Sequence, residues 1–190
     1  MRVFGIDPGS DRTGYGCIDS DGRRHRLVVC GAIRARLADK FPDKLAAIHR
    51  TLSELIAECH PDCVAIENLF HAANVRSALK LGHARGVAML AAVEAGLSVV
   101  EYTPAEIKRA VVGYGRAEKP QVGQMVKLLL GLDAIPSPHD AADALAVAIC
   151  HLHAGRGAAK ATHGAAKATP SGEVLRAPLP RSWRSYRPRA

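Results

Sequence analysis

The stretch Val3-Phe4-Gly5-Ile6-Asp7-Pro8-Gly9-Ser10 joins an apolar, strand-like run to a single acid and then to a turn. An acid at the end of a buried strand costs free energy unless its charge is paired or bound to a metal. Similar signals follow downstream, where Ile66-Glu67 ends another apolar run and Asp140-Ala141-Ala142-Asp143 opens a predicted helix. Oxygen-only ligands favour Mg²⁺ or Mn²⁺ over zinc. The sequence therefore predicts a metal-dependent enzyme.

Length and composition bound the class of protein. The chain has 190 residues, 48% of them hydrophobic, which suits one folded domain with an appendage. It has no apolar run of about 18 residues that would span a membrane. It begins with strand-like sequence and shows no signal peptide, which predicts a cytoplasmic protein. The cysteines lie in apolar runs or helices, as reduced core thiols do, and their spacing fits no usual zinc site.

The formal net charge of +8 is concentrated near the C-terminus. Residues 1–155 hold 18 Lys and Arg against 17 Asp and Glu, whereas residues 156–190 hold 8 basic residues and one acid. We therefore expect a folded domain over 1–154 and a basic, low-complexity, disordered tail over 155–190. Such a tail would either add sequence-independent affinity for nucleic acid or act only as a solubilising extension.

The periodicity of apolar residues predicts an α/β domain. Strands are expected at 2–7, 13–19, 26–33, 63–66 and 98–102, and helices at 42–59, 73–95, 104–111, 118–130 and 138–154. Three hairpin-connected strands followed by alternating helices and strands predict a mixed five-stranded sheet flanked by helices. The order of the strands does not follow from this pattern.

Two explanations compete for the acids at the start of the last predicted helix. Ser137 is a good N-cap, Pro138 suits the first helical position, and Asp140 would be a capping-box acid. Asp143, however, lies three residues on and projects from the same face as Asp140, near His139. Like charges on one face repel each other unless something positive lies between them. A metal therefore explains the pair better than capping does.

Taken as a set, the motifs resemble the RuvC family of bacterial Holliday-junction resolvases. The match covers about residues 1–153, and the tail beyond it resembles no family. The motifs are, in chain order, Gly5-Ile6-Asp7-Pro8-Gly9-Ser10, Thr13-Gly14-Tyr15-Gly16, Ala65-Ile66-Glu67 with Phe70 and Asn74, Ser77-Ala78-Leu79-Lys80-Leu81-Gly82, Ala84-Arg85-Gly86-Val87-Ala88, Val111-Val112-Gly113, Ala117-Glu118-Lys119 and Asp140-Ala141-Ala142-Asp143-Ala144-Leu145-Ala146.

The resemblance implies an RNase H-like fold and a crossover junction endodeoxyribonuclease. Such an enzyme resolves four-way DNA junctions by paired symmetric nicks during homologous recombination and DNA repair. The family's four catalytic acids would hold two Mg²⁺ ions, with Mn²⁺ as a substitute. They match Asp7, Glu67, Asp140 and Asp143.

Three further positions match family residues that contact DNA. Lys108 and Lys119 match basic positions near the scissile phosphate, and Phe70 matches an aromatic residue that stacks on opened bases. Plainer explanations are solvated lysines and a core phenylalanine. His139 is expected to be a neighbour of the metal site rather than a ligand, because both aspartates are present.

The predicted helix at 73–95 carries two apolar faces, of which one would form a homodimer. The expected partner-facing stripe, with two glycines that allow close approach, is Leu79, Gly82, Gly86, Val87 and Leu90. The plainer alternative is that this stripe packs on the protein's own sheet. The face expected to pack on the sheet is Val75, Ala78, Leu81, Ala88 and Ala92. Two symmetric nicks need two sites related by a two-fold axis. The resemblance also implies the RuvA–RuvB branch-migration complex as a partner.

Three rival classes share parts of this pattern. Actin-like ATPases open with a similar Asp-x-Gly-Ser loop but need a second glycine-rich phosphate loop and roughly twice the length. YqgF-like RNA-processing proteins share the opening motif but lack the Phe70 loop and the long helix around Gly82 and Gly86. A non-enzymatic junction-binding module would tolerate loss of the acids, and none is missing here.

Overall fold

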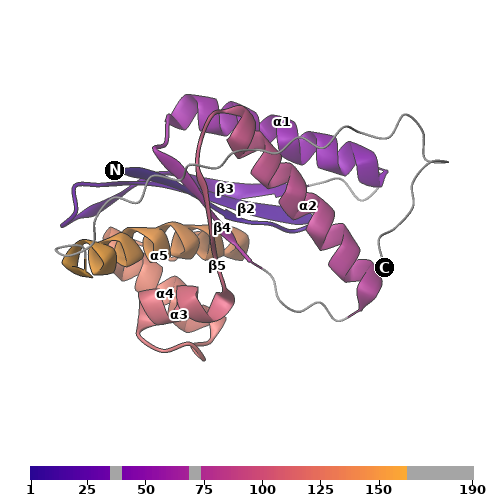
Figure 1. The fold of residues 1–190 in the computed structure, drawn as a ribbon. Helices are drawn as coiled ribbons and strands as arrows, with labels where there is room; N and C mark the ends of the chain where they lie inside the picture. The colour runs from indigo at the N-terminus through magenta and orange to yellow at the C-terminus, as the bar shows by residue number, and fades with distance from the viewer. Residues whose placement is uncertain (35–39, 69–73, 162–190) are drawn as a thin grey trace, which may run out of the picture.

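The computed structural model of the chain describes residues 1–34, 40–68 and 74–161, with side chains as far as residue 154 (Figure 1). No helix in these ranges is long and apolar enough to cross a membrane. The predicted elements are all present, and their ends differ from the predictions by a residue or two, except at the end of α5. In chain order they are β1 (Arg2–Asp7), β2 (Arg12–Ser20), β3 (His25–Arg34), α1 (Phe41–Cys59), β4 (Cys63–Glu67), α2 (Val75–Glu94), β5 (Val99–Tyr102), α3 (Pro104–Val112), α4 (Lys119–Leu130) and α5 (His139–Ala161).

The strands form one mixed sheet in the order β3-β2-β1-β4-β5. The hairpins make β1, β2 and β3 antiparallel neighbours, whereas β4 pairs in parallel with both β1 and β5. The parallel strands are reached through the helical crossovers α1 and α2, which a parallel connection requires. Because β1 and β4 run in the same direction, their last residues, Asp7 and Glu67, lie at the same edge of the sheet.

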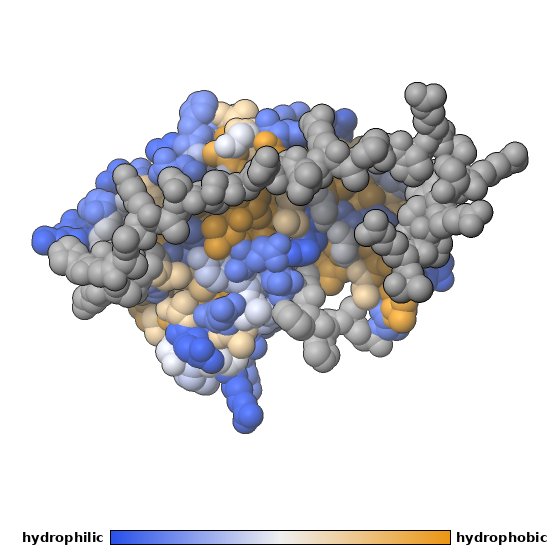
Figure 2. All heavy atoms as spheres, in the orientation of Figure 1, coloured by the Kyte–Doolittle hydropathy of each residue, from blue (hydrophilic) through white to orange (hydrophobic). Residues whose placement is uncertain are grey.

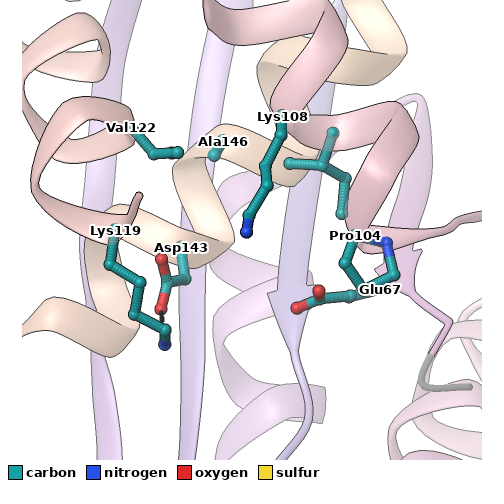
Figure 3. Close-up of a pocket in the computed structure, with 8 residues that line it drawn as sticks. Glu67, Pro104, Lys108, Lys119, Val122, Asp143 and Ala146 are labelled. Carbon is teal, nitrogen blue, oxygen red and sulfur yellow. Dashed lines mark hydrogen bonds and ion pairs between the residues drawn. The ribbon is translucent and has the colours of Figure 1, made fainter. Parts of the chain in front are cut away.

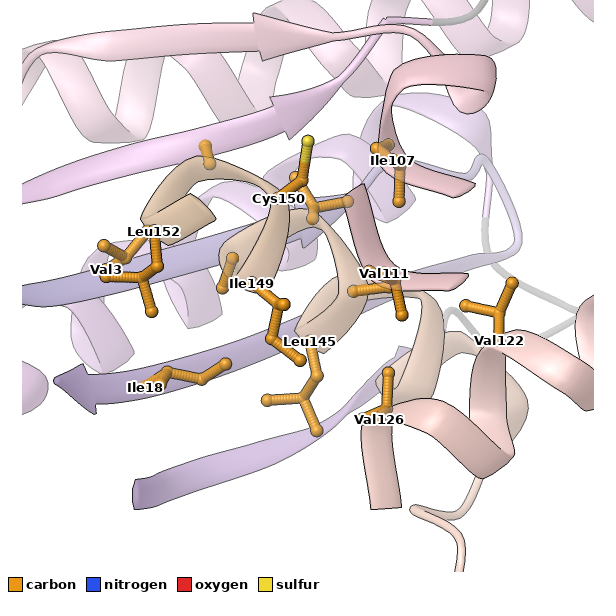
Figure 4. Close-up of a cluster of buried hydrophobic side chains, with 14 of the residues drawn as sticks. Val3, Ile18, Ile107, Val111, Val122, Val126, Leu145, Ile149, Cys150 and Leu152 are labelled. Atoms are coloured by element: carbon orange, nitrogen blue, oxygen red, sulfur yellow. The ribbon is translucent and has the colours of Figure 1, made fainter. Parts of the chain in front are cut away.

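Helices cover both faces of the sheet, with α1 and α2 on one side and α3, α4 and α5 on the other (Figure 1). Each layer encloses its own apolar core, and the core under α5 includes Ile18, Val126, Leu145 and Ile149 (Figure 4). The five cysteines are free, and four of them are buried, as expected of core thiols. The α/β fold with a mixed five-stranded sheet is confirmed.

Glycines let α5 lie close against β1 and β2. A Cβ added at Gly5 would collide with the backbone oxygen of Ala144, and one added at Gly14 would collide with the backbone oxygen of Asp140. The first turns of α5 therefore approach the sheet at backbone distance. This close approach brings the acids of α5 to the edge where β1 ends.

The start of α5 differs from the prediction. The helix begins at His139, so Pro138 rather than Ser137 precedes it, and the Pro138 carbonyl accepts a hydrogen bond from Ala141 N at 2.9 Å. Asp140 therefore does not occupy the third helical position that a capping-box acid needs. At its other end the helix continues past residue 154 to Ala161.

The sheet-facing side of α2 also differs from the prediction. Ala88 and Ala92 are buried as expected, but Val75 is 77% exposed and Ala78 is exposed. Ala84 and Ala91 are buried in their place. The difference arises because the buried residues of α2 all lie at or beyond Ala84, and the first turn of the helix projects away from the core (Figure 1).

Candidate active site

Acidic and basic side chains from four elements meet beyond the ends of β1 and β4. Glu67 lies at the end of β4, Asp143 on the first turns of α5, Lys108 on α3 and Lys119 at the start of α4. They line a small cavity of about 70 Å³ together with apolar neighbours (Figure 3). The apolar part of the lining, which the sequence analysis did not identify, is Pro104, Ile107, Val122 and Ala146.

Asp7 and Glu67 form a carboxyl pair at this edge. The register Ile6 to Ile66 places the two acids side by side. Desolvation, followed by the charge of Glu67 and a hydrogen bond to it, raises the pKa of Asp7 to about 8. Desolvation also raises the pKa of Glu67, although the hydrogen bond from Asp7 opposes that shift. The pair therefore retains a proton near neutral pH, as closely spaced carboxyl groups do when no cation neutralises them.

Lys119 is bound to the third acid. Its ammonium donates a hydrogen bond of 2.8 Å to Asp143 Oδ2, and this bond raises the pKa of Lys119 (Figure 3). The position of the lysine follows from a capping box, in which Glu118 N donates to Gln121 Oε1 at 2.8 Å and α4 begins at Lys119. The Lys119 charge also lowers the pKa values of Asp7 and Glu67, against the larger effect of desolvation.

Lys108 is placed by a second capping box, at the start of α3. Thr103 N donates to Glu106 Oε2 at 2.8 Å, and Glu106 N donates to Thr103 Oγ1 at 3.3 Å. One turn later, Lys108 points into the cavity, with its ammonium between Asp143 and Glu67 in the view of Figure 3. Its charge lowers the pKa of Glu67, against the larger effect of desolvation.

Asp140 lies one turn before Asp143 but is engaged elsewhere. Its Oδ2 atom lies 3.9 Å from Nη1 of Arg12, at the start of β2, and its side chain does not line the cavity. His139 is exposed beside it. Arg12 was not among the predicted site residues, because only the pairing of β1 with β2 brings it next to α5. Phe70 lies outside the described residues.

The donor atoms are of the type that binds a hard divalent cation, although the described side chains do not converge on one point in this structure. Within the described ranges, no three Asp, Glu, His or Cys side chains converge as a group able to hold a metal ion. The donors are nevertheless carboxylate oxygens, the type that Mg²⁺ and Mn²⁺ prefer. Two of the carboxyl groups have raised pKa values, and a third has already attracted a cation, Lys119. A divalent ion there would relieve the repulsion among them.

The comparison with protein families decides the class. A family model described as crossover junction endodeoxyribonuclease RuvC matches residues 3–151. This chain belongs to the RuvC family. The crossover junction endodeoxyribonuclease RuvC of Koribacter versatilis (strain Ellin345) is 56% identical over 154 residues, covering 80% of this chain and 93% of that protein. The tail predicted from residue 155 onward lies outside the family match.

Solved RuvC structures agree with this fold. Thermus thermophilus RuvC is 34% identical and superposes with a TM-score of 0.77, covering 83% of this chain and 97% of its own. T. thermophilus RuvC in complex with Holliday junction substrate gives a TM-score of 0.76 at 32% identity, covering 83% of this chain and 96% of its own. The predicted RNase H-like architecture is therefore confirmed.

Proposed function

We propose that this RuvC family member is a crossover junction endodeoxyribonuclease. It resolves four-way (Holliday) DNA junctions by paired symmetric nicks during homologous recombination and DNA repair. The observation that carries the proposal is the edge of the sheet where Asp7, Glu67 and Asp143 meet two lysines. Relatives of this chain bear the same enzyme name, and the T. thermophilus relative was solved with a Holliday junction substrate.

We propose that the acids hold Mg²⁺, two ions per site, and that Mn²⁺ can replace it. The ligands would be Asp7, Glu67, Asp140 and Asp143. When bound, the ions would activate the attacking water and stabilise the leaving 3′ oxygen in an in-line displacement. Asp7 has to release its proton before it can act as a ligand, because its pKa is raised to about 8. Asp143 and Asp140 have to turn from Lys119 and Arg12 toward the cavity.

The basic residues at the cavity would bind the DNA backbone. Lys119 is 76% exposed although its ammonium is bonded to Asp143, so it can exchange that carboxylate for a phosphate oxygen. Lys108 points into the cavity between Glu67 and Asp143, where a scissile phosphate would sit (Figure 3). Phe70, which follows β4 in the sequence, would stack on bases opened at the crossover.

A homodimer through α2 would supply the second nick. Large side chains on α2 remain exposed, with Leu79 at 59% and Leu90 at 50%, and apolar surface is visible along this helix (Figure 2). The shallow hollow between them, about 480 Å³, includes Gly82 and Gly86, where an added Cβ would meet nothing within 4 Å. A partner helix can therefore approach the backbone of α2 closely. Two copies related by a two-fold axis would present two sites to one junction.

The remaining sequence predictions complete the proposal. We propose that residues 1–154 form the nuclease domain and that residues 155–190 form a basic appendage, the start of which continues α5 to Ala161. We also propose a cytoplasmic location and an interaction with the RuvA–RuvB branch-migration complex. The support for these statements is the basic composition of the tail and the membership of the RuvC family.

The experiment that tests the function uses synthetic DNA. A four-way junction and a linear duplex of the same sequence are incubated with the full-length protein in Mg²⁺, and the nick positions on all four strands are mapped. We expect nicks at symmetric positions on two opposite strands of the junction and none on the duplex. Equal cutting of junction and duplex, or no cutting of either, would refute the proposal.

A further inference from the structure

A single imidazole ties α5 to β4 and β5. His151 Nδ1 lies 2.9 Å from the hydroxyl oxygen of Tyr102, and His151 Nε2 lies 3.3 Å from Sγ of Cys63. The two rings also meet edge to face, with their centroids 5.9 Å apart. Tyr102 ends β5 and Cys63 begins β4, so one side chain of α5 reaches two neighbouring strands.

Tyr102 is also the strand neighbour of a proposed metal ligand. In the parallel β4–β5 pair it lies opposite Glu67, and its carbonyl accepts a hydrogen bond from Asn68 N at 2.7 Å. Paired residues of a sheet direct their side chains to the same face, which here is the face that α5 covers. The next residue, Thr103, caps the helix that carries Lys108. Tyr102 thus connects β4, the start of α3 and α5.

The contact lies on the β4 and β5 side of α5, away from the glycines against which the helix packs. The glycines that let the backbone of α5 lie close to the sheet are Gly5 on β1 and Gly14 on β2. Toward β4 and β5 the described polar contacts of α5 are those of His151. Asp143 precedes His151 by two turns of a continuous helix, about 12 Å at 1.5 Å per residue. A tilt of α5 at His151 would therefore move Asp143 relative to Glu67.

Burial keeps His151 and Tyr102 in the uncharged states that their hydrogen bond requires. Desolvation lowers the pKa of His151 and raises the pKa of Tyr102 to about 12. At neutral pH the imidazole is therefore uncharged, with one nitrogen donating and the other accepting, and the phenol keeps its proton. Loss of either partner would leave a half-buried polar group without its hydrogen bond, which costs more than the bond itself contributes.

We propose that Tyr102 is a positioning residue for the metal site, because its hydrogen bond to His151 sets the separation between Glu67 on β4 and Asp143 on α5. The inference rests on the proposed metal-dependent function. Partners that orient metal ligands from outside the site typically change metal affinity or activity by about 10–100-fold when they are removed. The hydroxyl of Tyr102 is assigned that role here.

The test removes the hydroxyl alone, in Tyr102→Phe. Tyr15→Phe is the matched control, since Tyr15 is a half-buried tyrosine that packs against Phe4 in the opposite core. Mn²⁺ binding to DNA-free protein is measured by the paramagnetic resonance of the free ion, alongside thermal melting and junction cleavage. We expect Tyr102→Phe to raise the Kd for Mn²⁺ about tenfold and to lower kcat, with KM for the junction unchanged. Tyr15→Phe should match the wild type in Mn²⁺ affinity and kcat.

A double variant separates positioning from stability. Tyr102→Phe combined with His151→Ala should weaken Mn²⁺ binding no more than His151→Ala alone, because the two side chains act through one contact. If Tyr102→Phe lowers the melting temperature but binds Mn²⁺ as the wild type does, Tyr102 is only structural and the inference is wrong. If His151→Ala does not fold, Tyr102→Phe alone decides. A wild-type protein that neither binds Mn²⁺ nor cuts junctions would refute the proposed function and this inference together.

Discussion

Asp7 and Glu67 end two adjacent parallel strands, and the protonated carboxyl group of Asp7 donates a hydrogen bond to Glu67. The parallel direction of β1 and β4 places the two acids together, since both strands end at the same edge of the sheet. Desolvation and mutual repulsion then make the pair costly to ionise. Carboxyl groups perturbed in this way mark a candidate functional site, and the proposed metal site follows from this pair.

Without divalent cations, we expect the contribution of Asp7 to the stability of the wild type to fall as pH rises from about 4 to about 8. The pKa of Asp7 is raised from 3.8 to about 8 by folding, so the native state holds more protons than the unfolded state across this window. The slope of the unfolding free energy with pH is then negative. Thermal melting in EDTA should show a smaller decline for Asp7→Asn, which has no proton to lose. Parallel curves for the two proteins would contradict the raised pKa of Asp7.

Replacing Lys119 should slow cleavage while leaving junction binding nearly intact. Lys119→Ala removes a cation that lies 2.8 Å from Asp143 and that is proposed to bind a phosphate oxygen of the DNA. Loss of one preorganised electrostatic contact of this kind costs about 10²–10³-fold in kcat. Lys127→Ala, in the last turn of the same helix, is the control and should cut at the wild-type rate. Single-turnover cleavage of a junction decides, and equal rates for the two variants would exclude Lys119 from the site.

Replacing Phe70 tests whether this residue helps to open the junction rather than to cut it. If its ring stacks on unpaired bases, it supplies about 1–3 kcal/mol per base. Phe70→Ala should then cut intact junctions poorly but recover on junctions with mismatched central bases, where a few kcal/mol of unstacking cost has already been removed. A core phenylalanine would instead cost about 3–5 kcal/mol of stability on truncation. A lowered melting temperature with equal impairment on both substrates would assign Phe70 to packing.

A charge on α2 should dissociate the proposed dimer. Leu79→Glu places a carboxylate in the surface that a partner helix would desolvate, and an unpaired buried charge is strongly unfavourable. Leu128→Glu, on α4, is the control because Leu128 is 68% exposed, compared with 59% for Leu79. Sedimentation equilibrium should give monomers for Leu79→Glu and dimers for Leu128→Glu and the wild type. Dimers of Leu79→Glu would place the interface elsewhere.

The sequence predicted those features that depend on local patterning. The ends of β1 and β4 could be located because apolar periodicity acts within a few residues, whereas Lys108 and Lys119 were identified through the family resemblance. Features set by tertiary packing could not. The exposure of Val75 depends on how far α2 extends beyond α1, and the proximity of Arg12 to Asp140 depends on strand pairing. The bond between Tyr102 and His151 joins residues far apart in the chain and carries no local signal.

The central claim is that the acids at the end of β1 and β4 hold the metal that cuts the junction. The most direct measurement compares the wild type with Asp7→Asn on one four-way junction in Mg²⁺, recording cleavage and binding in parallel. Phosphate contacts come mainly from basic side chains and backbone amides, so the variant should bind like the wild type. We expect its cleavage to be abolished. Cleavage by Asp7→Asn at a near wild-type rate would contradict the account.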